Sequence, residues 1–213
     1  MEKIKIIVAS SNVGKIREIC AMLGENYEVI SKKEAGVDVK IIEDAPDFMG
    51  NALLKAKGIF AALKQEGNIL VLSDDSGLCV DCLDGEPGVY SARYAKWHDD
   101  TTENAEDSDN RLYLQKRLHE VGSKQSSARF VASMVLYGKI NNQIICLQAQ
   151  GECEGIVFDN EKGEGGFGYD SMFMPLGYDK RMAELDITIK NAISHRFNAL
   201  KQLIIQLEKV LHG

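Results

Sequence analysis

The stretch LSDDSGLCVDCLDGEPGVYSARY, residues 72–94, follows directly on the apolar run Ile69–Leu72. A short apolar run of this kind, bounded by polar residues, is typical of a buried strand. We expect the strand to end near Asp74 and Asp75, in an exposed turn beside a binding cleft. If the strand persists, the two carboxylates point to opposite faces of the sheet. One or two carboxylates are enough for a Mg²⁺ ion that keeps several waters, whereas a turn with a solvated acidic pair is the simpler alternative.

The residues that follow Asp75 help to decide between a Mg²⁺ site and a turn with a solvated acidic pair. Gly85, Pro87 and Gly88 fix a particular backbone path before an aromatic and basic segment. The whole pattern, DDSGLxVDxLxGxPGVYSARYA over residues 74–95, closely resembles the signature of the non-canonical purine nucleoside triphosphate pyrophosphatases, the inosine triphosphate pyrophosphatase family. The resemblance implies hydrolysis between the α and β phosphates of ITP, dITP and XTP, giving a nucleoside monophosphate and pyrophosphate.

Length and composition are those of an ordinary globular protein. The chain has 213 residues, of which 45% are hydrophobic and 27% are charged. This length suffices for one sizeable core, and we expect a single domain over residues 1–213. The expected fold is α/β, with a mixed central β-sheet flanked by helices and a nucleotide cleft between two lobes. The family resemblance also implies a homodimer.

Charge and cysteine content limit the possible partners. A formal net charge of −7 argues against binding to a nucleic-acid polymer, which needs a basic face, but leaves room for a small anion held by local lysines. We find no long uncharged apolar run and no signal-peptide pattern, so we predict a cytoplasmic protein that does not enter a membrane. The five cysteines are predicted to be free thiols, because the lone CxxC at Cys79 and Cys82 has no second pair or histidine nearby.

The N-terminus predicts a strand at residues 3–9, a turn, and then an amphipathic helix. This arrangement aims backbone N–H groups and a helix dipole at an anion, although an ordinary helix cap is the more common use of such a turn. The apolar stripe of the helix comprises Ile16, Ile19, Cys20 and Leu23. The family's phosphate-binding motif falls on Ser10, Ser11, Asn12, Val13, Gly14 and Lys15.

A second acidic stretch lies at Glu43. Residues 37–41 alternate between apolar and polar, which predicts a strand that delivers Glu43, and Asp47 is placed to cap the next helix. The family pattern here is matched by Glu43, Phe48, Asn51, Ala52, Lys55 and Ala56, with Gly50 where the family usually has a glutamate. The resemblance implies that Glu43 and Asp75 hold Mg²⁺, that Asp75 is the general base supported by Asp74, and that Lys55 and Ser76 contact phosphates and sugar.

The middle of the chain is expected to be mainly structural. Residues 98–110 are polar and acidic, and we interpret them as a solvated connection. A helix follows, with Leu112, Leu118 and Val121 as its expected inner residues. Residues 128–139 and 143–153 predict two strands joined by a turn at Asn141 and Asn142.

The glycine-rich loop at residues 163–170 is the third candidate for chemistry. Its glycines permit close backbone approach to a ligand, and its aromatic rings offer flat faces on which a nucleobase can stack. The family's base-pocket motif GFGYD contributes Phe167, Gly168, Tyr169 and Asp170. The next residue is usually proline in the family and is Ser171 here, a change expected to affect loop stiffness rather than chemistry.

The C-terminal segment carries the family motif KNAISHR at residues 190–196. Asp186 is placed to cap the last helix, whose apolar stripe comprises Ile193, Phe197, Leu200, Ile204, Leu207 and Leu211. Lys190, His195 and Arg196 do not share one face of an ideal helix, so they converge on one ligand only if that helix begins after Asp186. Donors such as His195, Arg196 or backbone N–H groups beside the 6-oxo group of hypoxanthine or xanthine would lack an acceptor with adenine, which accounts for selectivity against adenine but not against guanine.

Two other functions compete with this hypothesis. One is a nucleotide-binding sensor without turnover, against which the intact Glu43, Asp74, Asp75 and Lys190 argue. The other is a pyrophosphatase for canonical or modified pyrimidine nucleotides on the same scaffold. Release of pyrophosphate from a panel of triphosphates would separate all three.

Overall fold

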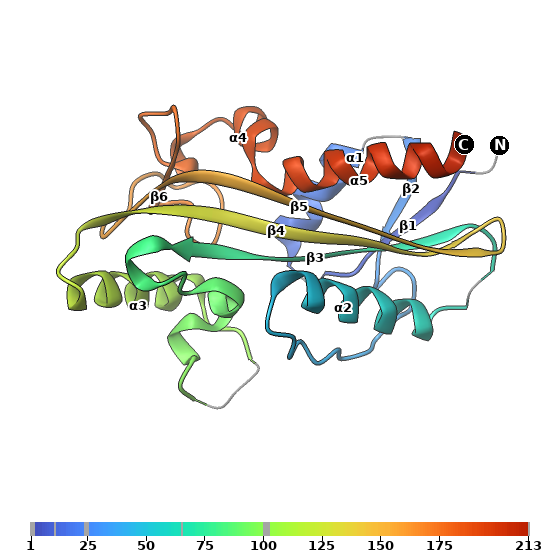
Figure 1. Cartoon of the computed structure of the whole chain (residues 1–213), viewed down its shortest axis with the longest axis horizontal. Helices are drawn as coiled ribbons and strands as arrows, with labels where there is room; N and C mark the ends of the chain where they lie inside the picture. Colours follow the sequence, from blue (N-terminus) through green and yellow to red (C-terminus); the bar gives the residue numbers. More distant parts are fainter. Residues whose placement is uncertain (1–2, 11, 24–25, 65, 100–102, 213) are drawn as a thin grey trace. The chain divides into compact units, whose positions relative to one another are not determined.

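The structure, a computed structural model, describes residues 3–10, 12–23, 26–64, 66–99 and 103–212. Within these ranges a six-stranded sheet has the strand order β2-β1-β3-β4-β5-β6 (Figure 1). Its strands are β1 (Lys5–Val8), β2 (Glu28–Ser31), β3 (Ile69–Val80), β4 (Gln125–Ile140), β5 (Gln143–Phe158) and β6 (Phe173–Pro175). The α-helices are α1 (Val13–Leu23), α2 (Phe48–Ala62), α3 (Asp107–Glu120), α4 (Ile187–Ile193) and α5 (His195–His212), and 3₁₀ helices cover Asp81–Leu83, Gly88–Lys96 and Met182–Glu184.

The sheet is mixed, which confirms the predicted α/β fold class. β1 pairs in parallel with both β2 and β3, and β5 pairs antiparallel with β6. The chain divides into two compact units: unit 1 holds residues 1–75, 132–151 and 196–213, and unit 2 holds residues 76–131 and 152–195. The prediction of a single domain with an inter-lobe cleft stays a prediction.

Unit 1 is a sheet with a helical layer on each face. Alternate residues of the strands point to opposite faces, so Ile6 and Leu70 pack with α1 and α5 while Ile7 and Val71 pack with α2. The layers can be followed in Figure 1, where α2 and the pair α1/α5 lie on opposite sides of the strands. The predicted stripe of α1 is confirmed at Ile19 and Leu23 but is wrong at Cys20, which is exposed. The predicted stripe of the last helix is confirmed for α5 at Leu200 and Leu207, whereas Ile193 belongs to α4.

One strand predicted for unit 1 does not form, and one strand that does form was not predicted. Residues 37–41 alternate in burial as expected, but they form no strand and instead pack their apolar side chains on α2, where Gly58 leaves room for Ile41. The strand that occupies this edge of the sheet is β2, at Glu28–Ser31. Alternation in the sequence predicted which side chains are buried, but it could not show whether a sheet neighbour was available.

Unit 2 is built around α3 and the outer parts of the long strands. Its core comprises Leu78, Leu114, Leu118, Phe130, Val157 and Phe173, among others. The prediction for α3 was partly wrong, because Leu112 and Val121 are 60% and 49% exposed. The true inner stripe is Asn110, Leu114 and Leu118. A polar first member obscured it: the Asn110 amide bonds to the backbone of Ala95 and Ala92.

The β4–β5 hairpin is confirmed and is longer than predicted. Asn141 and Asn142 both have positive φ, 48° and 63°, as a two-residue turn between twisted strands requires. α4 and α5 are separated at Ser194, whose backbone is extended. Asp186 caps α4 as predicted, accepting a hydrogen bond from the backbone N–H of Thr188. The last helix of the sequence prediction is thus two helices, and Lys190 lies in the first of them.

Candidate functional site

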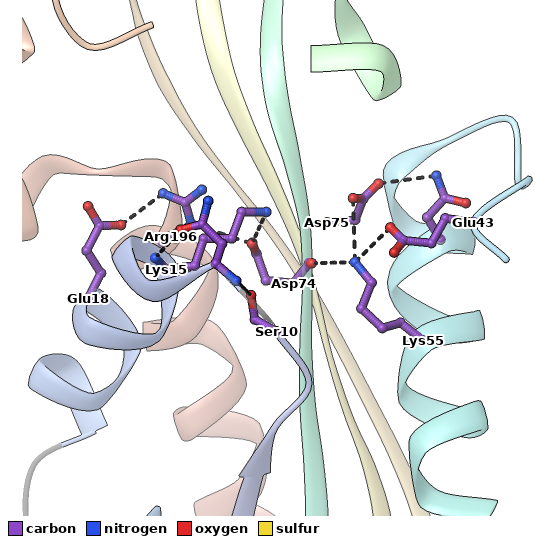
Figure 2. A network of polar contacts seen from close by, with 10 residues as sticks. Ser10, Lys15, Glu18, Glu43, Lys55, Asp74, Asp75 and Arg196 are labelled. Carbon is purple, nitrogen blue, oxygen red and sulfur yellow. Dashed lines mark hydrogen bonds and ion pairs between the residues drawn. The ribbon is translucent and has the colours of Figure 1, made fainter. Parts of the chain in front are cut away.

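The two acidic residues at the start of the signature lie within β3, not in a turn. β3 continues to Val80, so the turn predicted at Asp74–Gly77 is wrong and the alternative of a persistent strand is confirmed. Alternation then continues along the strand: Leu72 and Asp74 face α1 and α5, while Ser73 and Asp75 face α2. Figure 2 shows the two carboxyl groups on opposite sides of the strand.

On the α1/α5 side, Asp74 is enclosed by two cations. Its Oδ2 lies 2.6 Å from Lys15 Nζ and 3.5 Å from Arg196 Nε, and its side chain is fully buried. Burial alone would raise the pKa of Asp74, but Lys15 and Arg196 outweigh it and hold the pKa well below the ordinary range. Arg196 also donates to Glu18 Oε2 at 2.9 Å. Glu18, Arg196, Asp74 and Lys15 form a chain of alternating charge, buried except at Lys15 (Figure 2).

On the α2 side, Asp75 has a different environment. Burial raises the pKa of Asp75; Lys55 and Lys15 oppose this, whereas the charges of Glu43 and Asp74 add to it. Asn51 donates from Nδ2 to Asp75 Oδ2 at 3.3 Å, and its Oδ1 accepts from the Ala45 N–H, which ties the segment after Glu43 to the same helix. A carboxylate with a raised pKa that remains partly accessible is a better proton acceptor than its locked neighbour.

Lys55 lies among three oxygen atoms on this side. Its Nζ is 2.8 Å from Glu43 Oε2, 3.1 Å from the Asp74 carbonyl oxygen and 3.8 Å from Asp75 Oδ1. A cationic group within reach of two carboxylates and a carbonyl marks a place where hard oxygen ligands converge. Among the described residues, no group of three His, Cys, Asp or Glu side chains could hold a metal ion. Two carboxylates with waters nevertheless fit Mg²⁺, which keeps part of its hydration shell.

The N-terminal motif lies at the start of α1. Asn12 is the cap: its Oδ1 accepts from Lys15 N–H at 3.0 Å, and Ser10 Oγ accepts from Asn12 N–H at 3.1 Å. Val13 and Gly14 begin the helix, and Ser11 lies outside the described residues. The segment is a helix cap in form, and it places Lys15 against Asp74.

Local packing accounts for the glycine at position 50. It lies at the start of α2, where its N–H donates to the capping carboxylate of Asp47. A Cβ atom at this position would come within 2.6 Å of the Ala45 Cβ. The glutamate that the family pattern has here would therefore require Ala45 to move.

The predicted base-contacting residues lie in unit 2, apart from Arg196. Asp170 Oδ2 accepts from Lys190 Nζ at 2.7 Å and from the Phe167 N–H at 2.9 Å. Lys190 Nζ lies 4.8 Å from the centre of the Phe167 ring. Gly166, with φ +77°, leaves no room for a side chain beside Asp170. Phe167, Asp170 and Lys190 thus lie together, and we call this group of one aromatic ring and two charged side chains the corner.

The other predicted residues have more structural surroundings. Tyr169 is buried in the core of unit 2, and its hydroxyl donates to the Ser91 carbonyl. His195 stacks on Phe130 with ring centres 5.0 Å apart, and Ser76 lies in β3. Arg196 belongs to unit 1, where it contacts Glu18 and Asp74. The predicted role of Arg196 toward the base stays a prediction.

Some residues of the site were not singled out from the sequence. Glu18 is one turn from Lys15 on α1, a spacing that could have indicated a shared environment. Asn51 was matched to the family pattern, but its contact with Asp75 was not foreseen. Asp107 and Arg111 of α3 bind the backbone of Gly168 and had no signal beyond their own i, i+4 spacing.

The fold and this charge pattern define an α/β protein with a lysine-lined acidic site suited to a phosphorylated ligand. A model of the Ham1 family matches residues 6–206, and the chain belongs to this family. It is 42% identical over 211 residues to a dITP/XTP pyrophosphatase of Campylobacter jejuni, covering 98% of this chain and 100% of that protein. A dITP/XTP pyrophosphatase of Sulfurimonas denitrificans is 41% identical, with coverage of 96% and 98%.

Solved structures of similar proteins have the same fold as this chain. The Staphylococcus aureus Ham1 protein superposes with a TM-score of 0.79 at 36% identity, covering 96% of this chain and 98% of that one. A nucleoside-triphosphatase, or dITP/XTP pyrophosphatase, from Mycobacterium abscessus gives a TM-score of 0.69 at 32% identity, with coverage of 94% and 99%. No helix within the described ranges is long and apolar enough to cross a membrane.

Proposed function

We propose that the chain is a Mg²⁺-dependent nucleoside triphosphate pyrophosphatase that hydrolyses dITP, ITP and XTP to the monophosphate and pyrophosphate. Membership of the Ham1 family and nearly full-length similarity to dITP/XTP pyrophosphatases support the enzyme class. The single observation that carries the chemistry is the unequal environment of Asp74 and Asp75, because it leaves one carboxylate locked between cations and the other poised to accept a proton.

Asp75 is the general base of this proposal. The proton of the attacking water passes to its carboxylate, the new P–O bond forms at the α phosphorus, and the bond to the β-phosphate oxygen breaks to release pyrophosphate. Asn51 orients the carboxylate through its amide.

Glu43 and Asp75 would hold the metal ion. When bound, Mg²⁺ neutralises phosphate charge and orients the attacked phosphorus. Lys55 already lies among these oxygens, so it is placed to move onto a phosphate when the ion binds. Lys15 and the N–H groups at the start of α1 supply further positive charge for the phosphates.

In unit 2, Phe167 offers a face for the base and Lys190 a donor beside it. An ammonium N–H beyond the one that Asp170 accepts can donate to the 6-oxo group of hypoxanthine or xanthine, whereas the 6-amino group of adenine offers it no acceptor. Guanine also has a 6-oxo group, so this donor alone does not exclude it. A homodimer and a cytoplasmic location belong to this proposal as expectations from the sequence.

The test is a panel of ITP, dITP, XTP, GTP, ATP and dUTP, with pyrophosphate release measured with and without Mg²⁺. We expect fast release from the first three and none without the metal. Binding of ITP without release would favour a sensor, preference for dUTP a pyrimidine pyrophosphatase, and equal rates for ATP and ITP would refute the selectivity.

A further inference from the structure

The glycine-rich loop of unit 2 is held from outside by α3. The Gly168 N–H donates to Asp107 Oδ2 at 2.7 Å, and the Gly168 carbonyl accepts from Arg111 Nη1 at 2.9 Å. The two side chains are four residues apart and share one face of the helix. Both polar groups of one loop residue are therefore bound by one helix turn. Asp107 belongs to the acidic segment interpreted from the sequence as a solvated connection; it is exposed as expected, but it is the first residue of α3 and holds the loop.

Arg111 also contacts Glu161, which precedes the loop, and through it is linked to Ser171, which follows the loop. Its Nε lies 2.7 Å from Glu161 Oε2, a contact that is an ion pair rather than an aligned hydrogen bond. The same oxygen accepts from Ser171 Oγ at 2.8 Å, and the Lys162 N–H donates to the Ser171 carbonyl. We call Asp107, Arg111, Glu161 and Ser171 the loop clamp.

The loop clamp is suited to positioning rather than to global stability. The side chain of Glu161 is 38% exposed and that of Arg111 20% exposed, and exposed ion pairs contribute little to the free energy of unfolding. The backbone they hold, however, leads directly into Phe167 and Asp170, which set the corner with Lys190. A shift of this backbone would move the ring and the ammonium group relative to each other.

We propose that Asp107 and Arg111 are positioning residues for purine selectivity, which they exert by fixing the loop that carries Phe167 and Asp170. This inference rests on the proposed function. Ser171 takes part through Glu161, so a side-chain hydrogen bond restrains the loop where a proline ring would otherwise restrict φ.

The experiment compares Arg111→Ala with the matched control Arg129→Ala, which also removes a partly buried arginine with acidic partners, Asp81 and Glu152. We expect Arg111→Ala to raise KM for ITP on the order of tenfold, the size of one lost charge-assisted hydrogen bond, with kcat within about twofold of wild type. The preference for ITP over ATP in kcat/KM should fall. Arg111→Lys, which keeps one contact, should be intermediate, and Arg129→Ala should match the wild type.

Rescue provides a second readout. Glu161→Gln should raise KM for ITP, and Ser171→Pro added to it should lower KM again, because the ring restores stiffness without the hydrogen bond. Thermal unfolding midpoints should stay near that of the wild type throughout. Unchanged KM and unchanged ITP preference in Arg111→Ala, or a lower kcat at constant KM, would overturn the inference. Absence of pyrophosphate release from ITP by the wild type would instead refute the proposed function.

Discussion

The two sides of β3 carry adjacent carboxylates with opposite properties. Asp74 faces α1 and α5, where the buried Arg196 and the partly buried Lys15 hold it ionised. Asp75 faces α2, where burial and the nearby negative charges favour its protonated form more than Lys55 and Lys15 favour the ionised one. Because side chains alternate along a strand, one step in the sequence places Asp74 between two cations and Asp75 on the face where we propose that the reaction takes place.

The largest effect is expected on the α2 side. Asp75→Asn should lower pyrophosphate release from ITP by about 10²–10⁴-fold, the usual contribution of a general base. The thermal unfolding midpoint near pH 7 should not fall, because an ionised carboxylate with a raised pKa costs stability that asparagine does not. Activity above about a tenth of the wild-type rate would contradict the role assigned to Asp75.

On the other side, the corresponding variant should act on folding. Asp74→Asn leaves Lys15 and Arg196 buried without their shared carboxylate, and we expect a loss of about 3–5 kcal/mol in the free energy of unfolding. Urea denaturation at pH 7 measures it. If Asp74→Asn and Asp75→Asn lose equal stability, the contrast between the two sides does not hold.

The pH dependence of stability should show the same asymmetry. The pKa of Asp74 is lowered in the folded protein from the ordinary 3.8, so its stabilisation is complete above that value and is lost as pH falls below it. We expect the free energy of unfolding of the wild type to decrease more steeply below about pH 4 than that of Asp74→Asn. Parallel curves for the two proteins would show that Asp74 is not held ionised by its neighbours.

A smaller effect is expected at Asn51. Asn51→Ala removes the donor to Asp75 and leaves the Ala45 N–H without this acceptor, at a cost of about 1–3 kcal/mol in stability. Because Glu43 precedes Ala45 by two residues, the Mg²⁺ concentration for half-maximal activity should also rise. Asn198→Ala, a change on α5, serves as the control and should leave the metal requirement unchanged. An unaltered metal requirement in Asn51→Ala would show that Asn51 does not support the metal site.

Much of this architecture could be predicted from the sequence, for identifiable reasons. The hairpin was predictable because two adjacent asparagines tolerate positive φ, and the α2 cap because Asp47 precedes an apolar helix pattern. β2 was missed because its four residues carry no clear alternation, and the inner stripe of α3 because its first member is polar.

The sequence motifs predicted which residues belong to the candidate site, but not which of those residues contact one another. The motifs identified Lys15, Lys55, Asp75 and Lys190 without showing which groups they contact. The Glu18–Arg196 ion pair joins residues 178 positions apart, and the loop clamp joins α3 to a loop some fifty to sixty residues later. Such pairings depend on tertiary packing, which a local pattern does not encode.

The central claim is that the metal ion and the reaction belong to the α2 side of β3. The most direct measurement is a crystal structure with Mg²⁺ and an ITP analogue that cannot be cleaved between the α and β phosphates. We predict the ion about 2.1 Å from oxygens of Glu43 and Asp75, with Asp74 still bound to Lys15 or Arg196 and outside the coordination shell. An ion bound by Asp74, or bound away from both Glu43 and Asp75, would contradict the account.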